Sequence, residues 1–180
     1  ARNQYKKLGW QPIAGEADSN SKLRAIVIGL MLFSEDAEAI ASAEKIYNSN
    51  NVENITPELR GLIISAFVRH NHSEKNVDAL LKLYSETSSC ELKQDLCIGI
   101  TSTHDVKTIN KILGLIKDLG FIKQQDSMRW IVNLLRNRIA RDITWKWIRE
   151  NWKWIKKVFG SDKSYDDFPR YIANFLSRKS

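Results

Sequence analysis

Residues 141–160 read RDITWKWIRENWKWIKKVFG and contain four of the six tryptophans in this chain of 180 residues. Apolar side chains recur there at the three- and four-residue spacing of one helix face, at Trp145, Ile148, Trp152, Ile155 and Phe159. Most charged residues on the opposite face are basic. A buried tryptophan removes roughly 150–250 Å² from water. We therefore predict one helix over residues 141–160, with Trp152 in the core and the neighbouring helices packed around it.

The rest of the composition is that of a globular helical chain. Hydrophobic residues make up 43% of the sequence, and only 8 glycines and 3 prolines interrupt it. No apolar run approaches the roughly 20 residues of a membrane span, and the first residues lack the apolar centre of a secretory signal. The sequence therefore predicts a cytoplasmic protein without a membrane segment, with one domain over residues 1–180 or two small ones.

Helical periodicity continues through the chain, and no stretch alternates as a strand does. About nine helices are predicted, after an entry segment at residues 1–19 whose turn or loop places Trp10 against the body. Successive helix pairs begin near residues 20, 57, 90 and 124, so the repeat is about 33–37 residues long. The predicted fold class is all-α, an irregular α-solenoid of antiparallel helix pairs similar to HEAT and armadillo repeats.

No self-contained catalytic group is visible in the sequence. The three histidines, His70, His72 and His104, lack the HExxH context of a zinc peptidase. Cys90 and Cys97 lie seven residues apart on one predicted helix, about 10 Å along its axis, too far for a disulfide. We predict that both are small buried thiols and that the chain itself holds no metal or cofactor.

Basic residues are concentrated in the second half of the chain. Of the net charge of +7, residues 1–90 carry −1 (10 Lys and Arg against 11 Asp and Glu) and residues 91–180 carry +8 (18 against 10). Arg129, Arg136, Arg138 and Arg141 gather where one predicted helix ends and the next begins. Guanidinium groups bind carboxylate or phosphate in a bidentate manner, so the cluster predicts a site for an anionic ligand. Ordinary solvent exposure, with salt bridges to Asp126 and Asp142, is the alternative.

A series of motifs in fixed order resembles a known family. The motifs are Leu8-Gly9-Trp10, Gly15-Glu16, Leu23-Arg24, Ile55-x-Pro57-Glu58-Leu59-Arg60, Ile122-Lys123-Gln124-Gln125-Asp126, Asn137-x-x-Ala140-Arg141 and Trp145-x-Trp147-Ile148-x-x-Asn151-Trp152. Together they resemble the C-terminal helical domain of the M1 family of zinc aminopeptidases, of the aminopeptidase N type. The closing tract, with Tyr165, Phe168 and Phe175, is most similar to the enzymes of Gram-positive lactic acid bacteria. Ala140 stands where the family pattern usually has glycine.

The resemblance implies a domain without its own catalytic residues. Family members remove N-terminal residues from peptides with a zinc ion, which is bound by HExxH in a separate domain that this chain lacks. The C-terminal domain covers that active site and lines the substrate chamber. The chain would then be an inactive fragment whose partners are peptide substrates and the catalytic and N-terminal domains of the same polypeptide. The predicted chamber contacts are Gln125, Asp126, Arg136, Asn137, Arg138 and Arg141.

Some alternatives remain open at this stage. Asn137 and Arg141 also fit a role in helix packing, and Asp126 also fits a helix cap. A basic helical-repeat module that binds nucleic acid is a second hypothesis, and a protein-interaction solenoid is a third. Nucleic acid is the weaker partner because the tryptophans of residues 141–160 share the apolar face, opposite the lysines.

Overall fold

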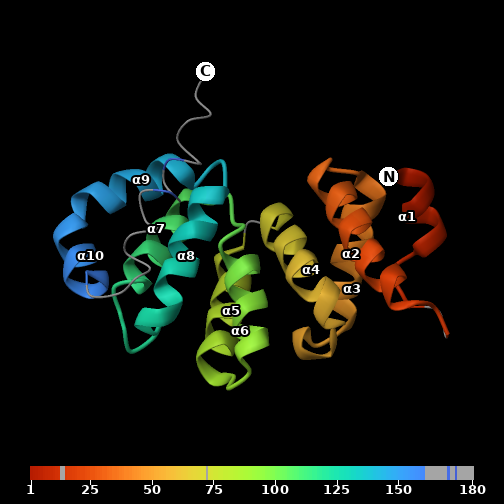
Figure 1. Cartoon of the computed structure of the whole chain (residues 1–180), viewed down its shortest axis with the longest axis horizontal. Coiled ribbons are helices and arrows are strands. Elements are labelled where there is room, and N and C mark those ends of the chain that lie inside the picture. The colour runs from red at the N-terminus through yellow and green to blue at the C-terminus, as the bar shows by residue number, and fades with distance from the viewer. Residues whose placement is uncertain (13–14, 72, 161–169, 171–172, 174–180) are drawn as a thin grey trace. The chain divides into compact units, whose positions relative to one another are not determined.

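The computed structural model describes residues 1–12, 15–71, 73–160, 170 and 173 (Figure 1). Every regular element in these residues is a helix, so the predicted all-α class is confirmed. The chain forms two compact units, residues 1–100 and 101–180. The predicted final helix at Phe168, Tyr171, Ile172 and Phe175 lies outside the described residues.

The first unit contains six α-helices and a short 3₁₀ turn. They are α1 (Arg2–Leu8), α2 (Asp18–Phe33), α3 (Ala37–Ser49), η1 (Val52–Asn54), α4 (Pro57–His70), α5 (Glu74–Glu86) and α6 (Cys90–Ile100). Helix α4 packs against α2, α3 and α6, while α5 packs against α6. The central element of this unit is therefore α4.

The second unit contains four helices within its described residues, α7 (Val106–Leu115), α8 (Gln124–Arg136), α9 (Arg141–Glu150) and α10 (Trp152–Phe159). Helix α9 contacts α7, α8 and α10. Helices α2, α4, α6 and α8 begin at Asp18, Pro57, Cys90 and Gln124, so the predicted starts of the helix pairs are confirmed. The solenoid remains a prediction.

The entry segment begins with a helix that the sequence analysis did not predict, since residues 2–8 form α1. Tyr5 and Leu8, three residues apart, are its buried side chains. Gly9 then turns the chain with φ 59°, a backbone conformation that glycine adopts without strain. The predicted placement of Trp10 is confirmed. Its Nε1 donates to the Tyr5 hydroxyl at 2.9 Å, and its ring packs against the hydrophobic core of the first unit.

The helix predicted over residues 141–160 is broken in two at Asn151. Asn151 has φ −107° and ψ 18°, outside the helical values, and its Nδ2 donates back to the Trp147 carbonyl oxygen at 2.8 Å. The prediction that Trp152 is a core residue is wrong, because 37% of its surface is exposed. Ile148, Ile155 and Phe159 are buried as predicted. The fully buried tryptophan is instead Trp130 of α8, with 0% exposure.

The two cysteines also have different environments. Both are free thiols, but Cys90 is exposed and only Cys97 is buried. Cys90 is the first residue of α6, where the helix has not yet entered the core. The prediction of two buried thiols is therefore wrong for Cys90.

Two arginines of the sequence motifs form ion pairs inside the first unit. Arg24, 3% exposed, donates from Nη1 and Nη2 to the two carboxylate oxygens of Glu16, at 2.6 Å each. Hydrogen bonding to Glu16 raises the pKa of Arg24 above its usual value. Arg60 donates from Nη1 to Asp95 at 3.0 Å, which joins α4 to α6. Burial nevertheless raises the pKa of Asp95, although Arg60 acts in the opposite direction.

Candidate functional site at the end of helix α8

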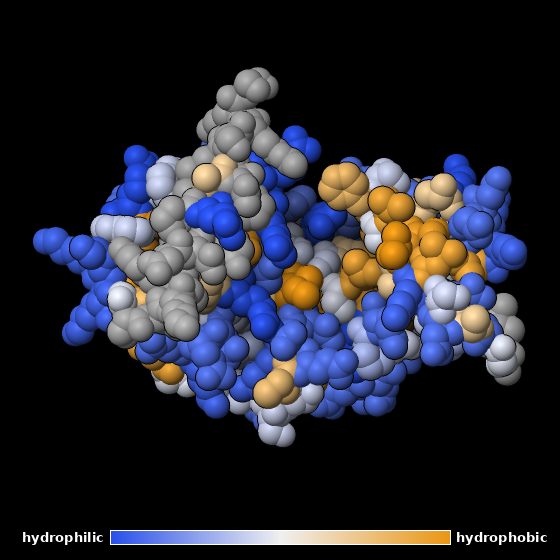
Figure 2. Space-filling model, viewed as in Figure 1, coloured by the Kyte–Doolittle hydropathy of each residue, from blue (hydrophilic) through white to orange (hydrophobic). Residues whose placement is uncertain are grey.

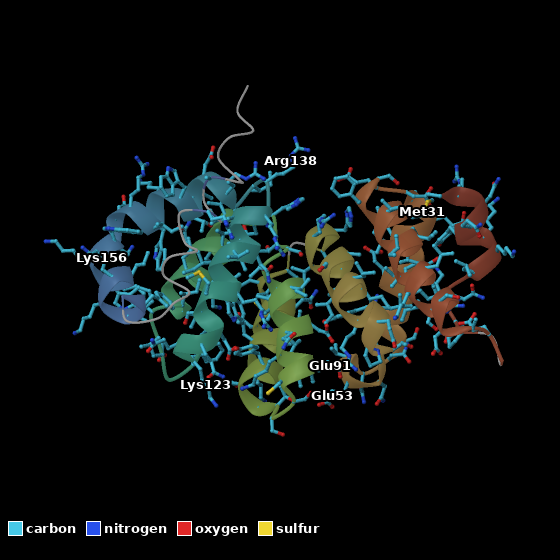
Figure 3. All side chains as sticks on the ribbon, viewed as in Figure 1. Met31, Glu53, Glu91, Lys123, Arg138 and Lys156 are labelled. Atoms are coloured by element: carbon cyan, nitrogen blue, oxygen red, sulfur yellow. The ribbon has the colours of Figure 1, made fainter. Side chains whose placement is uncertain are left out.

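The six predicted site residues lie at two ends of α8 rather than in one place. Gln125 and Asp126 belong to its first turn, whereas Arg136 is its last residue. At 1.5 Å per residue, the Cα atoms of Gln125 and Arg136 are about 16 Å apart. Figure 3 labels Lys123 and Arg138, just beyond the two ends of the helix, and shows this separation. The structure therefore does not bring the six residues into a single contact site.

The beginning of α8 contains no capping carboxylate. Lys123 occupies the cap position and no side-chain hydrogen bond is made there, so the alternative of Asp126 as a side-chain cap is wrong. Asp126 remains in the first turn, where its charge complements the helix dipole. Gln125 is exposed, and its neighbour Gln124 donates from Nε2 to the Val158 carbonyl oxygen of α10 at 2.7 Å.

Asn137 holds the opposite end of α8 in place. Its Nδ2 donates to the carbonyl oxygens of Thr101 and Thr103, at 2.9 and 2.7 Å. Its Oδ1 accepts from the backbone N–H groups of Ile139 and Ala140, at 3.0 and 3.4 Å. One amide side chain therefore joins the α8–α9 turn to the segment before α7, and the predicted alternative of a packing role explains its contacts.

Arg141 also joins neighbouring segments through a hydrogen bond to the backbone. As the first residue of α9, it donates from Nε to the Leu135 carbonyl oxygen at 3.0 Å, near the end of α8. The preceding Ala140 is fully buried with a helical backbone, φ −79° and ψ −20°. Glycine is not required at that position, because alanine adopts this conformation without strain.

Arg136 and Arg138 differ from these two residues because both are exposed. Among the described residues, neither makes a hydrogen bond or an ion pair. The alternative salt bridge from the arginine cluster to Asp126 does not form within this part of the chain. Two guanidinium groups at the end of α8, beside the exposed Ile139, are therefore available to an anion. Such groups bind carboxylates through two parallel N–H···O bonds.

Sequence reasoning missed the partners that hold this end of α8. Thr101 and Thr103, each 2% exposed, supply backbone carbonyl oxygens to Asn137. Backbone acceptors leave no signature in a residue pattern, so the sequence could not indicate these partners. Trp130 was also missed, although it lies next to Ile131 and four residues before Leu134, on the buried side of α8.

The described residues contain no group that fits a metal ion. No cluster of three or more His, Cys, Asp or Glu side chains comes together within the residues that the structure describes. His70 ends α4 and Asn71 follows it, while His72 lies outside the described residues. No helix in this part of the chain combines the length and apolar character that crossing a membrane needs.

Comparison with known proteins confirms the resemblance given by the motifs. The chain is 31% identical over 170 residues to Aminopeptidase N of Lactobacillus helveticus, covering 93% of this chain and 20% of that protein. It is 32% identical over 173 residues to Aminopeptidase N of Lactococcus lactis subsp. cremoris MG1363, covering 94% and 20% respectively. Glutamyl aminopeptidase of Mus musculus is 28% identical over 160 residues, covering 88% and 17%.

The chain thus spans about a fifth of the length of the lactic acid bacterial relatives. The family model described as the ERAP1-like C-terminal domain matches residues 1–180, which is the whole chain. This protein chain belongs to the ERAP1-like C-terminal domain family.

Proposed function

We propose that the chain is the C-terminal domain of a zinc-dependent aminopeptidase that removes N-terminal residues from peptides in the cytoplasm. The observation that carries this proposal is the family match over residues 1–180, together with aminopeptidase relatives of which the chain spans a fifth. In this role the domain covers the active site and lines the chamber that receives the peptide. It acts beside the catalytic and N-terminal domains of the same polypeptide.

Zinc belongs to another part of that polypeptide in this proposal. The described residues offer no metal-binding cluster, so they do not fit the ion. Zinc would supply the activated water for hydrolysis, and no step of that chemistry involves a described residue of this chain. Residues 1–180 alone should therefore cleave no aminoacyl-p-nitroanilide. Cleavage that a chelator abolishes in the isolated chain would contradict the proposal.

Arg136 and Arg138 are the residues that we assign to the substrate. A peptide that enters an aminopeptidase with its N-terminus first carries its free carboxylate away from the zinc. Two exposed guanidinium groups, which form no ion pair with another described residue, would attract that carboxylate. Asn137 and Arg141 would hold this surface in place through their backbone contacts. Gln125 and Asp126, at the other end of α8, would contact a different part of the chamber.

The test uses the complete enzyme and two matched substrates. We expect Arg136→Ala/Arg138→Ala to raise KM for a tetrapeptide with a free C-terminal carboxylate by about 5- to 30-fold, the loss of one or two exposed charge-assisted contacts. KM for the same tetrapeptide with a C-terminal amide should not change. Lys75→Ala, which removes an exposed charge on α5, is the control and should affect neither substrate. Equal effects on the acid and the amide would contradict the assignment.

One observation keeps nucleic-acid binding as a second candidate. Trp152 is exposed beside the exposed Lys153, Lys156 and Lys157 of α10, so the argument that every tryptophan lies opposite the lysines does not hold for this ring. An aromatic ring beside cationic side chains can stack on a base. Salt-sensitive binding of single-stranded DNA that Trp152→Ala abolishes would favour this candidate, and a flat binding curve at low salt would dismiss it.

A further inference from the structure

Helix α2 has a sequence that is apolar on every side. Residues 23–33 read LRAIVIGLMLF, and the one charged residue among them, Arg24, is buried in its ion pair with Glu16. A helix of this composition is normally buried all round. Helix α4 is the comparable case in this unit, and it is covered by α2, α3 and α6. The composition of α2 therefore predicts neighbours on all of its sides.

The first unit covers only one side of α2. Its buried apolar residues are Val27, Ile28, Met31 and Leu32, which face a core shared with α1, α3 and α4. The other side is exposed at Leu23 (38%), Ile26 (61%), Leu30 (52%) and Phe33 (78%). We call these four residues the α2 face. Figure 2 shows apolar surface gathered over the part of the unit where α2 lies in Figure 1.

The α2 face has the form of a helix-docking stripe. Its four residues recur at spacings of three, four and three, so they form one row about 15 Å long on the helix surface. Between Lys22 and Glu35 no exposed charged residue interrupts this row. An occupant therefore needs a matching row of apolar side chains and no charge at its centre. An amphipathic helix supplies such a row of apolar side chains. Helix α4 already packs against the buried side of α2.

The length of the relatives indicates where that helix comes from. The chain spans about a fifth of the lactic acid bacterial relatives, so four fifths of such a protein lie outside the residues described here. A second copy of this chain is the weaker occupant. One stripe of four side chains buries far less than the roughly 1,200 Å² of a stable protein–protein interface. A segment of the same polypeptide is tethered and needs no such area.

We propose that the α2 face is the docking surface for an amphipathic helix from another part of the same, longer polypeptide. The proposal rests on family membership and on the burial pattern of α2. It does not depend on whether the domain lines a substrate chamber.

The test measures thiol accessibility in the complete polypeptide expressed from its own gene. In a Cys90→Ser background, which removes the exposed native thiol, Ile26→Cys probes the α2 face. Lys45→Cys on the exposed side of α3 is the matched control. Each rate of reaction with a maleimide is divided by the rate of the same variant in urea. We expect this ratio to be at least 10-fold lower for Ile26→Cys than for Lys45→Cys. Leu30→Cys should repeat the result if Ile26→Cys folds poorly.

Two outcomes would overturn the proposal. Equal ratios at the two positions would show that the α2 face is open to solvent in the complete polypeptide. Protection that disappears on dilution would identify a second copy as the occupant. A peptidase assay on the same samples keeps the two proposals separate, because loss of the chamber role changes activity and leaves the labelling ratio unchanged.

Discussion

Arg24, Arg60 and Arg141, three arginines of the sequence motifs, each donate from Nε to a backbone carbonyl oxygen. The acceptors are Leu8, Ile55 and Leu135, at 3.2, 3.2 and 3.0 Å. In each case the acceptor precedes the arginine in the chain, so the side chain holds a helix against the segment that leads into it. A lysine cannot reproduce the planar fork that also reaches Glu16 or Asp95. These motif residues therefore stabilise the scaffold.

The first prediction compares a residue that stabilises the end of α8, Asn137, with an exposed residue assigned to ligand binding, Arg138. Asn137→Ala removes two donated and two accepted hydrogen bonds and leaves the Thr101 and Thr103 carbonyl oxygens without this donor. We expect a loss of about 2–4 kcal/mol in the free energy of unfolding. Arg138→Ala, at an exposed residue, should stay within about 0.5 kcal/mol of wild type. Urea unfolding followed by circular dichroism measures both. A loss for Asn137→Ala no larger than that for Arg138→Ala would contradict the packing role.

The second prediction concerns the acid sensitivity of α7. Asp105 caps this helix by accepting from the Thr108 hydroxyl at 2.6 Å and the Thr108 backbone N–H at 2.7 Å. These hydrogen bonds, the hydroxyl first, lower the pKa of Asp105 below its usual value. Loss of the cap in Asp105→Ala should cost about 1–2 kcal/mol at neutral pH.

The sign of the pH effect follows from that lowered pKa. The stabilisation is fully present above the pKa of Asp105 in the unfolded chain, and it is lost as pH falls through the lower value in the folded chain. The difference between wild type and Asp105→Ala should therefore shrink between about pH 5 and pH 2. Asp105→Asn keeps an acceptor but cannot ionise, so it should lack this pH dependence. Thermal unfolding at several pH values tests the expectation, and a constant wild-type to Asp105→Ala difference would contradict it.

The sequence predicted where important residues lie better than what they do. Asn137 and Arg141 stood out because they belong to an ordered motif, but their partners are backbone carbonyl oxygens. Every residue carries such an oxygen, so no residue type marks the acceptor. Thr101 and Thr103 lie 36 and 34 residues before Asn137. Only the fold brings segments that distant together.

At the level of helices, periodicity predicted existence, start positions and the burial of Ile148, Ile155 and Phe159, but it wrongly predicted Trp152 as a core residue. The rich apolar stripe of residues 141–160 suggested the central helix of the chain, and the structure gives that position in the first unit to α4. The break at Asn151 changes the direction of the stripe, which leaves Trp152 exposed. A periodic pattern assumes a straight helix, so it could not indicate which part of a broken one faces the core.

Two tryptophans test this correction directly. Trp130→Ala should lower the free energy of unfolding by about 3–5 kcal/mol, since the ring is fully buried. Trp152→Ala should cost less than about 1.5 kcal/mol, because more than a third of its surface already contacts solvent. Chemical unfolding of both variants under the same conditions gives the comparison. A larger loss for Trp152→Ala would show that its ring belongs to the core after all.

Two glycines provide a matched pair for the close packing of α4 and α6. A Cβ added at Gly99 of α6 would lie 2.6 Å from Cβ of Ile64 in α4, and Ile64 is fully buried. We expect Gly99→Ala to destabilise the chain by about 1–3 kcal/mol. Gly114 of α7 has open space around it, so Gly114→Ala should stabilise the chain by about 0.5–1 kcal/mol. The midpoint of thermal unfolding should be lower than that of wild type for Gly99→Ala and higher for Gly114→Ala. If Gly99→Ala were neutral, steric crowding against Ile64 would not occur at this position.

For the whole molecule, the decisive feature is that the first unit builds a core from its own residues. That core runs from Tyr5 to Ala66 and draws on α1, α2, α3 and α4. The second unit buries its own set, including Ile112, Trp130 and Ile148. The sequence predicted one domain or two small ones but could not locate this boundary, because helical periodicity continues through residue 100 without a linker composition.

The distribution of tryptophans makes the division measurable. Five of the six lie in the second unit, at positions 130, 145, 147, 152 and 154, so tryptophan fluorescence mainly reports that unit. Far-ultraviolet circular dichroism reports the helices of both. We expect Ile63→Ala in α4, a loss of about 2–5 kcal/mol, to move part of the dichroism transition to lower denaturant while the fluorescence transition keeps its midpoint. Ile131→Ala in α8 should shift the fluorescence transition instead. If each variant moved both transitions together, the two cores would unfold as one cooperative unit.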